Sequence, residues 1–397
     1  MSSQTASSIQ VSIKRQASKG APESGGGATG YNVVPTQGLV LNKAAIMSEL
    51  VRRDGMSTRG RHGSRSSSAV YASELSVGTF TSLIEAALRG TAVAATDITE
   101  ADMTSITTTT STIVAAAGSW LTEGVRKGDM VKLTGHSTAG NNGKWLRVLD
   151  VSALVITVPA ASLTLNAVAD TAFTLTVAKT IINGATPVER YHTVEEYEQD
   201  LDTSLLGTDM KITKLDFDAQ PNKHIKVTFT FMGLDAEPQD TGAAPILTSP
   251  TYSTTLPLVM VDGTIRIGGV DYDVLTGFQF SFDLGGSVPP TLSSISDDVY
   301  LGNGKISGSF TAHKKDLVFL QAFDAETQVD FFIVCAENEA DPADFESFYI
   351  GNATLNGNTS AIASEGPRVQ TIPWGGGIDE AGGASASTMI KYSTSAA

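Results

Sequence analysis

The chain has 397 residues, of which 41% are hydrophobic and 17% charged, and its formal net charge is −15. This length predicts two or three domains, and the large share of Thr, Ser, Gly and Val predicts a mainly β protein with few helices. The acidity argues against an ordinary nucleic-acid-binding protein, because affinity for phosphates comes largely from Lys and Arg side chains that displace counterions. No stretch approaches the roughly 20 apolar residues of a membrane span, so no membrane partner is expected.

The first segment, residues 1–30, is rich in Ser, Gly and Ala. Such composition predicts a flexible N-terminal arm that becomes ordered only against a partner. The segment lacks the continuous apolar core of a secretory signal peptide. We therefore expect the protein to be made and kept in solution.

A strongly basic stretch, "RRDGMSTRGRHGSRSSS", occupies residues 52–68. Its five arginines against one aspartate give +4, so the rest of the chain sums to −19. The Gly and Ser content predicts a flexible loop. We expect this loop to contact an acidic partner through its arginines, which are Arg52, Arg53, Arg59, Arg61 and Arg65.

The clearest helix is expected over residues 79–90, after the strand-like stretch "SSAVYASELSV". Thr79 can cap its start and Gly90 can end it. One face of this helix is apolar, with the spacing that a buried helix requires; it carries Phe80, Leu83, Ile84, Ala87 and Leu88.

Residues 93–190 change to short Thr- and Val-rich strands separated by Gly and Asn turns. This pattern predicts a small β-barrel or Ig-like domain, inserted into a first domain that consists of residues 31–92 and 191–240. Residues 241–397 are expected to form a second domain. There the stretch "FQFSFDL" alternates, with Phe278, Phe280 and Phe282 on one face of a strand and Gln279, Ser281 and Asp283 on the other.

Two distant segments share one plan, a strand followed by a helix. They are "SAVYASELSVGTFTSLIEAALRG" and "GKISGSFTAHKKDLVFLQAFDAE", in which Leu83, Ile84, Ala87 and Leu88 correspond to Val318, Phe319, Ala322 and Phe323. Each segment follows a long polar loop and is itself followed by paired strands. The shared order predicts an internal duplication.

Residues 11–150, including "IKRQASKGAP", the basic stretch, "TFTSLIEAALRG" and "GSWLTEGVRKGDMVKLTG", resemble the major tail tube proteins of long, noncontractile-tailed bacteriophages. The resemblance continues more weakly, by pattern, to the C-terminus. It implies two fused tail-tube-like β-sandwich or half-barrel domains, each with one short helix, and an inserted small β-barrel or Ig-like domain. It also implies a structural virion protein of the viral tail, assembled in the cytoplasm of the bacterial host.

The same resemblance implies that three chains form a ring of six similar units and that rings stack into a hollow tube. Its partners would be other copies of itself and further tail proteins: the tape measure, the tail terminator and the distal tail protein. Genomic DNA would pass through the lumen without specific binding. A polar or negative wall suits that task, because it offers no counterion-release sites to phosphates.

Two sets of residues are candidates for these roles. Gln279, Ser281 and Asp283 are candidates for the channel wall, although alternation shows that a strand has two faces and not which face lies inward. The basic loop at residues 52–68 is a candidate for contacts between rings, together with a counterpart at residues 285–298. A charged loop of one sign can hold repeated contacts in register on an acidic neighbour.

No pattern predicts catalysis, a cofactor or a metal site. The five histidines are dispersed, and neither "GGGATG" nor "TAGNNGKW" has the context or the residues of a phosphate-binding loop. Cys335 lies in a strand-like stretch and is expected to be a buried small hydrophobe. The protein is therefore expected not to be an enzyme, but two alternatives stay open: a secreted or virion-surface Ig-like or lectin-like adhesion protein, and a glycan-active enzyme with paired carboxylates.

Overall fold

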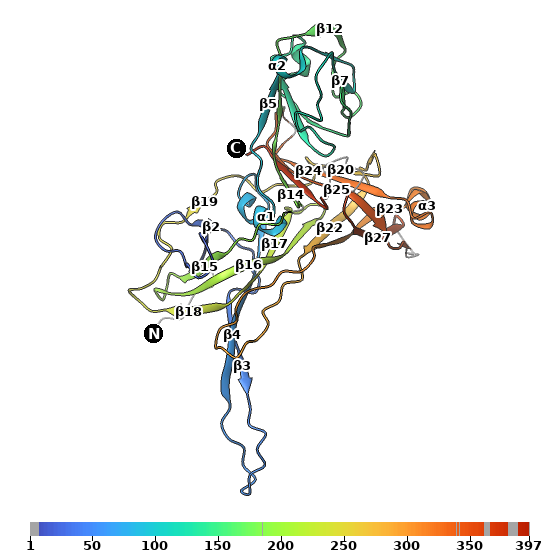
Figure 1. Ribbon diagram of the computed structural model, residues 1–397. Coiled ribbons are helices and arrows are strands. Elements are labelled where there is room, and N and C mark those ends of the chain that lie inside the picture. Colours follow the sequence, from blue (N-terminus) through green and yellow to red (C-terminus); the bar gives the residue numbers. More distant parts are fainter. Residues whose placement is uncertain are drawn as a thin grey trace.

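The computed structural model describes residues 8–184, 186–338, 340, 342–360, 366–379 and 388–396. It is mainly β, as the sequence predicts, with a broad body, a compact inserted part at one end and a long hairpin that projects from the opposite side (Figure 1). No helix in the described ranges is long and apolar enough to span a membrane.

Seven strands of the first half pair antiparallel, each with the next. Their order is β2 (Thr29–Tyr31), β1 (Ile9–Arg15), β15 (His192–Glu198), β16 (Thr203–Ala219), β17 (Lys226–Gly233), β4 (Arg61–Glu74) and β3 (Val40–Ile46). Strand β1 falls within the segment expected to be a flexible arm. It is ordered because its alternating Val11 and Ile13 are buried in the core.

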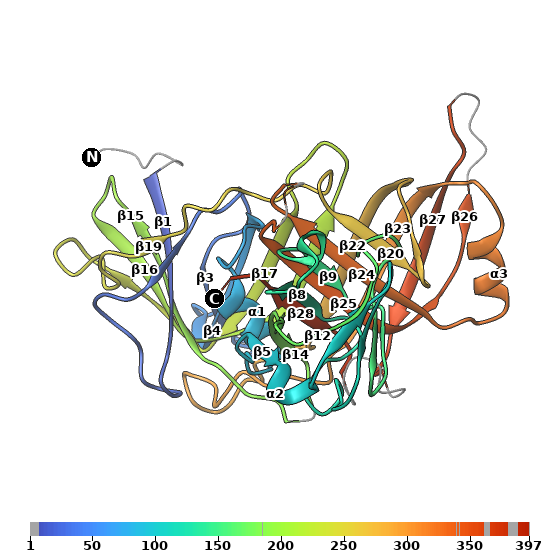
Figure 2. The same cartoon turned by 90° about the horizontal axis from the view of Figure 1, so that it is seen from above.

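Seven strands of the second half pair antiparallel in the same order. They are β21 (Val270–Asp271), β20 (Thr264–Ile267), β24 (Val329–Ala336), β25 (Phe345–Leu355), β27 (Val369–Gly376), β23 (Lys305–His313) and β22 (Leu275–Asp283). A helix follows the corresponding strand in both halves, α1 (Thr81–Leu88) after β4 and α3 (Val318–Asp324) after β23. The halves thus share both helix position and strand order, and they lie side by side in Figure 2.

The two halves join through a direct strand pairing. Strand β22 of the second half pairs antiparallel with β16 of the first, from Lys214 opposite Asp283 to Ala219 opposite Phe278. Smaller strands extend the sheets at other edges; they are β14 (Lys179–Ile182), β18 (Asp235–Gln239), β19 (Thr251–Tyr252), β26 (Thr359–Ser360) and β28 (Lys391–Thr394).

One aromatic core fills the interior of both halves. The alternating residues Phe278, Phe280 and Phe282 are buried in it, and Phe280 stacks on Phe217 of β16 at 5.1 Å between ring centroids. This contact crosses the seam between the halves. Burial of such large side chains is the main stabilising contribution to a seam of this kind.

The inserted part forms a five-stranded and a four-stranded sheet around a core of its own, which contains Trp120. Its elements are β5 (Thr96–Thr99), α2 (Glu100–Met103), β6 (Ile106–Thr108), β7 (Thr112–Ala115), β8 (Met130–Thr134), the 3-10 turn η2 (Ala139–Asn141), β9 (Trp145–Arg147), β10 (Asp150–Val151), β11 (Val155–Thr157), β12 (Asn166–Asp170) and β13 (Thr174–Val177). It rests on the second half, where Trp145 packs against Phe345 and Lys391 pairs with Asp129.

Helix α1 buries the expected apolar face but not with the expected caps. Phe80 occupies the N-cap position without a side-chain hydrogen bond, because the hydroxyl of Thr79 lies 2.6 Å from that of Ser76 instead. At the other end Arg89, in the left-handed region at φ 52°, ends the helix. Gly90 has a packing role, since a Cβ there would meet the carbonyl oxygen of Ile182.

Candidate functional site: a polar sheet face and a projecting hairpin

One face of the continuous sheet formed by β4, β17, β16, β22 and β23 points away from the core. We call it the polar sheet face. Its outward positions follow from the strand registers; the polar and charged ones include Glu74, Lys214, Asp216, Asp218, Lys226, Thr228, Gln279, Ser281, Asp283, Lys305, Ser307 and Ser309. Four carboxylates against three ammonium groups leave a charge of −1, so this face is polar and nearly neutral.

The charges on the polar sheet face alternate in sign across the strands. Lys226 lies opposite Glu74 on one side, and its partner on the other side is Asp218. Asp283 lies between Lys214 and Lys305 in the same way. Cross-strand pairs of opposite charge stabilise a sheet and leave no cluster of free cations for phosphate groups.

The three residues predicted for a channel wall lie together at the centre of this face. Gln279 and Asp283 are exposed and Ser281 is partly buried; the amide of Gln279 donates to Ser309 Oγ at 2.8 Å. Their neighbours on β16 and β17 were not predicted from the sequence. Those strands belong to the other half, and no local pattern shows which strands become partners.

The basic stretch forms much of a long hairpin made of β3, β4 and a tip at residues 47–60 (Figure 1). The sequence predicts a loop over 52–68, but the structure begins strand β4 at Arg61. The pairing of residues 61–68 with β3, and of 67–68 also with β17, overrides the weak strand propensity of Gly and Ser. Arg61 and Arg65 therefore lie on a strand, and only three of the five arginines lie in the tip.

The five arginines are not equivalent. Arg52 pairs with Asp54 at 2.6 Å. The hydrogen bonds that Asp54 accepts from Arg52 and from the backbone N–H of Met56 lower the pKa of its carboxyl. Arg65 pairs at 3.1 Å with the buried Asp235. The others form no ion pair with any described residue and are exposed; they are Arg53, Arg59 and Arg61.

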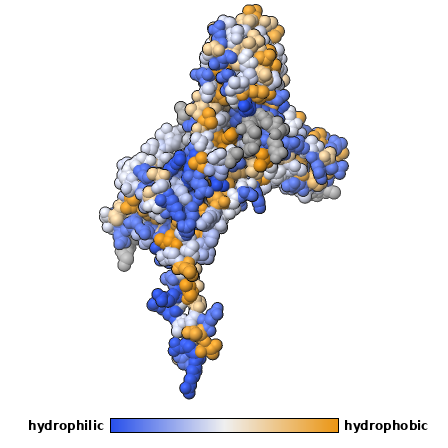
Figure 3. All heavy atoms as spheres, in the orientation of Figure 1, coloured by the Kyte–Doolittle hydropathy of each residue, from blue (hydrophilic) through white to orange (hydrophobic). Residues whose placement is uncertain are grey.

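Large apolar side chains are exposed at the same tip. Leu50 is 77% exposed and Val51 is fully exposed. Figure 3 shows hydrophobic and hydrophilic residues side by side along the hairpin; the exposed apolar ones are Ile46, Met47, Leu50, Val51 and Met56. Clustered exposure of this kind marks an interaction surface. Charge alone does not reveal this surface in the sequence, although the apolar stretch "IMSELV" stands directly before the arginines.

The expected counterpart, residues 285–298, lies in the loop 284–304 between β22 and β23, and this loop does not project as a second arm. It lies along the base of the hairpin, where Arg65 donates its backbone N–H to the carbonyl oxygen of Ser294 at 2.8 Å and pairs in a parallel bridge with Ile295. The loop therefore braces the hairpin from the second half of the chain.

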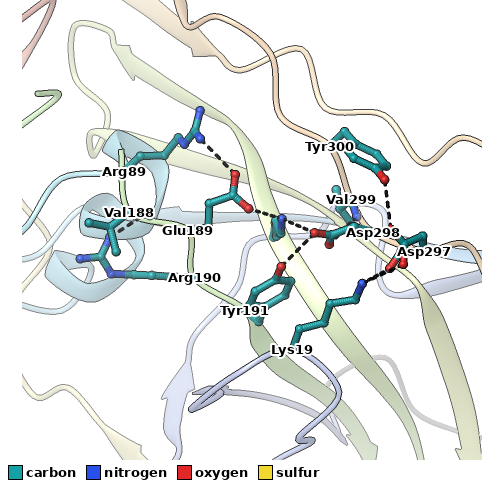
Figure 4. A network of polar contacts seen from close by, with 11 residues as sticks. Lys19, Arg89, Val188, Glu189, Arg190, Tyr191, Asp297, Asp298, Val299 and Tyr300 are labelled. Carbon is teal, nitrogen blue, oxygen red and sulfur yellow. Dashed lines mark hydrogen bonds and ion pairs between the residues drawn. The ribbon is translucent and has the colours of Figure 1, made fainter. Parts of the chain in front are cut away.

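A network of charged groups fixes the end of this loop (Figure 4). Lys211 of β16 is buried, with its ammonium 3.2 Å from Asp298 and in contact with Glu189. Burial lowers the pKa of Lys211, but the hydrogen bonds to Glu189 and Tyr191 and the charge of Asp298 outweigh it and raise the pKa above its usual value. Lys19 reaches Asp297 from the N-terminal segment. The Lys211 ammonium therefore stays charged, and it ties β16 to the segment that contains Glu189 and to the loop that contains Asp298.

Among the described residues no group of three or more His, Cys, Asp or Glu side chains is arranged to hold a metal ion. A family model described as Phage tail tube protein matches residues 6–376. No curated protein matches the chain. The matched range contains both halves, the hairpin and the inserted part.

Proposed function

The chain belongs to the phage tail tube protein family, and from this premise we propose that its copies close into rings that stack into the hollow tube of a phage tail. The family supports a structural role in the virion tail rather than an enzymatic one. Three chains per ring would supply six similar units, a number that the resemblance implies. The repeated strand order of the two halves supports this proposal, because like units can make like contacts around a ring.

The proposal divides the chain into two tube domains and an insert. Residues 31–92 and 191–240 form the first tube domain, 93–190 the insert and 241–397 the second tube domain. We add residues 9–31 to the first tube domain, since β1 pairs with β15 along its length. Assembly would take place in the bacterial cytoplasm, with the tape measure, tail terminator and distal tail proteins as further partners.

The polar sheet face is proposed to line the channel through which DNA passes. A near-neutral wall of paired charges holds a sliding polyanion weakly, because it releases no counterions. Neither helix nor the insert covers this face, since α1 and α3 pack on the core side and the insert rests on β24 and β25.

The hairpin is proposed to contact the next ring. One observation carries the stacking part of the proposal. The long hairpin has exposed apolar and basic residues at its tip, and its base is fixed by contacts with Asp235 and with the loop at 284–304. Alone in solution, such a tip would expose apolar surface to water at a cost of about 25 cal/mol per Å². Burial against a neighbouring ring removes that cost.

Negative-stain electron microscopy of the purified chain tests both parts. We expect tubes at high concentration from the natural chain. A variant in which residues 47–60 are replaced by Asn-Gly, the usual two-residue hairpin turn, should fold and form rings but no long tubes. Compact monomers alone from the natural chain would contradict ring formation and favour the adhesion-protein alternative. Long tubes from the shortened variant would contradict the role of the hairpin.

A further inference from the structure

Each half of the chain has strand edges without a partner among the described residues, and one edge in each half bears on ring closure. In the first half, β3 pairs only with β4. In the second half, β26 pairs only with β27. Unpaired edges invite pairing with another chain, and proteins that remain monomers usually block them.

The seam between the two halves is itself formed by the pairing of two such strand edges. There β22, the second half's counterpart of β3, pairs with the C-terminal part of β16. The counterpart of that part of β16 in the second half is β26, which continues the line of β25. Each chain therefore carries both sides of a second seam, but the two sides lie in different halves of the molecule, with β26 at the outer end of the second half (Figure 2).

The strand registers set the correspondence residue by residue. Asp216 lies opposite Thr228 in the first half, and Thr359 lies opposite Thr371 in the second. Both halves also have an irregularity at the same place, between His192 and Val194 in one and between Val329 and Phe331 in the other. Counting along these registers, Thr359 takes the place of Asp216.

The same counting applies to the other side of the seam. Lys226 lies opposite Glu74 and Val369 opposite His313, so Ser68 corresponds to Ser307. Val40 lies opposite Ser68, and Ser281 lies opposite Ser307. Val40 therefore takes the place of Ser281.

We propose that β3 of one chain pairs antiparallel with β26 of a second copy of this chain, in the register of the internal seam. Because Asp216 lies opposite Ser281 inside the chain, Val40 lies opposite Thr359 between chains, and Asn42 lies opposite Gly357. The inference rests on the proposed ring assembly and specifies its interface. None of these four residues is charged, so the polar sheet face continues around the ring without added charge.

The two helices give independent support. Leu83 and Leu88 of α1 are 3% and 0% exposed, whereas the corresponding Val318 and Phe323 of α3 are 48% and 38% exposed. Contacts from the second half lie at the start of α1, where Glu346 accepts a hydrogen bond from the backbone N–H of Gly78 at 2.7 Å.

Repeating this relation between chains places the first half of the next copy against the start of α3. The exposed apolar residues at this end of α3 and in the turn before it would then be covered; they are Leu317, Val318 and Leu320. The free edge of β26 and the exposed apolar residues of α3 lie at the same end of the molecule, and one neighbouring chain would cover both.

Cysteine cross-linking tests the register. The double variant V40C/T359C places two thiols on opposite residues of the proposed pair, at a Cα separation of about 4.4–6.8 Å that a disulfide accepts. Diamide accepts the two electrons and two protons that the thiols lose. The natural Cys335 is buried and free, so it adds little background. On a non-reducing gel the oxidised tubes should yield covalently linked chains, and a three-chain ring predicts a ladder that ends at three.

Matched variants separate register from mere proximity. D216C/S281C carries the equivalent pair inside the chain and should form a disulfide without linking chains. V40C/N358C is shifted by one residue, which turns the second thiol to the other sheet face, and should not cross-link. Mixing single variants V40C and T359C should give linked pairs that contain one chain of each kind.

The outcomes distinguish this inference from the proposed function. Tubes without cross-links in V40C/T359C would overturn the register and leave ring assembly standing, whereas a natural chain that never forms rings would overturn both. If V40C/T359C does not assemble, hydrogen exchange of the natural chain tests the pairing of β3 with β26 instead. Assembly should slow exchange at residues 40–42 and 357–359, and unchanged exchange there would overturn the pairing.

Discussion

At the scale of single residues, Glu346 is a carboxyl buried where the second half meets the start of α1. It accepts hydrogen bonds from the backbone N–H of Gly78 and from Thr394 Oγ1. Burial raises its pKa from 4.5 to about 7, against the opposing effect of these hydrogen bonds. The group is thus held in an environment that favours its protonated form.

The pH dependence of stability follows from this shift. The folded chain binds the Glu346 proton more tightly than the unfolded chain does, so the contribution of this proton to stability is complete below about pH 4.5. It is lost as the pH rises to about 7, a change of up to about 3 kcal/mol in the free energy of unfolding. We expect E346Q to raise the free energy of unfolding by about 1–3 kcal/mol at pH 8 and to have little effect at pH 4.5.

Urea unfolding of the unassembled chain at the two pH values measures this difference. Glu237→Gln, at an exposed position, serves as the control and should show no such dependence. An equal effect of E346Q at both pH values would mean that folding does not raise the pKa of Glu346.

At the scale of elements, the hairpin shows which features a sequence reveals and which it hides. Gly and Ser at 61–68 locally favour a loop, yet strand pairing with β3 makes these residues the start of β4. Helix 79–90 was predictable, because its apolar spacing is a local property. The exposure of α3 was not, since Val318 and Phe323 have the same spacing as their buried counterparts in α1 and differ only in what covers them.

The tip allows apolar and charged contributions to assembly to be separated. L50S/V51S removes exposed apolar surface, and we expect it to raise the concentration needed for tube formation at all salt concentrations, by about tenfold if roughly 1.4 kcal/mol of contact is lost per chain. R53E/R59E reverses two exposed charges, and its defect should shrink at high salt because surface charges are screened.

Sedimentation of tubes across a range of protein and salt concentrations measures both effects. L165S/V168S removes two exposed apolar side chains from the insert and is the matched control. Arg65 is left unchanged in these variants, because its reversal would also break the pair with Asp235 inside the chain. If L50S/V51S formed tubes at the same protein concentration as the natural chain, the apolar tip would not be buried between rings.

At the scale of the whole molecule, the polar sheet face is assembled from both halves. Alternation in "FQFSFDL" was enough to place Gln279, Ser281 and Asp283 on one face. It could not supply Lys214 or Lys226, which lie more than 45 residues before this stretch in the chain. A charge estimate from β22 alone suggests a negative wall, whereas the complete face balances its carboxylates with lysines.

This balance leads to a prediction about DNA in the tube. Q279K/S281K changes the charge of the face from −1 to +1 and places each new ammonium opposite an aspartate, Asp218 or Asp216, so the sheet should remain stable. Asp283 is less suitable for substitution by Lys, since it lies between Lys214 and Lys305 and three cations would then repel one another. Repeated around every ring, the added cations should hold DNA by counterion release.

Co-sedimentation of short double-stranded DNA with assembled tubes measures the effect. At low salt the Q279K/S281K tubes should retain more DNA than natural tubes, and the excess should disappear as salt rises, because each phosphate contact weakens with salt concentration. Q279N/S281T keeps the face neutral at these positions and should behave like the natural tube. Equal retention by all three tubes at low salt, with normal tubes by electron microscopy, would show that this face does not line the channel.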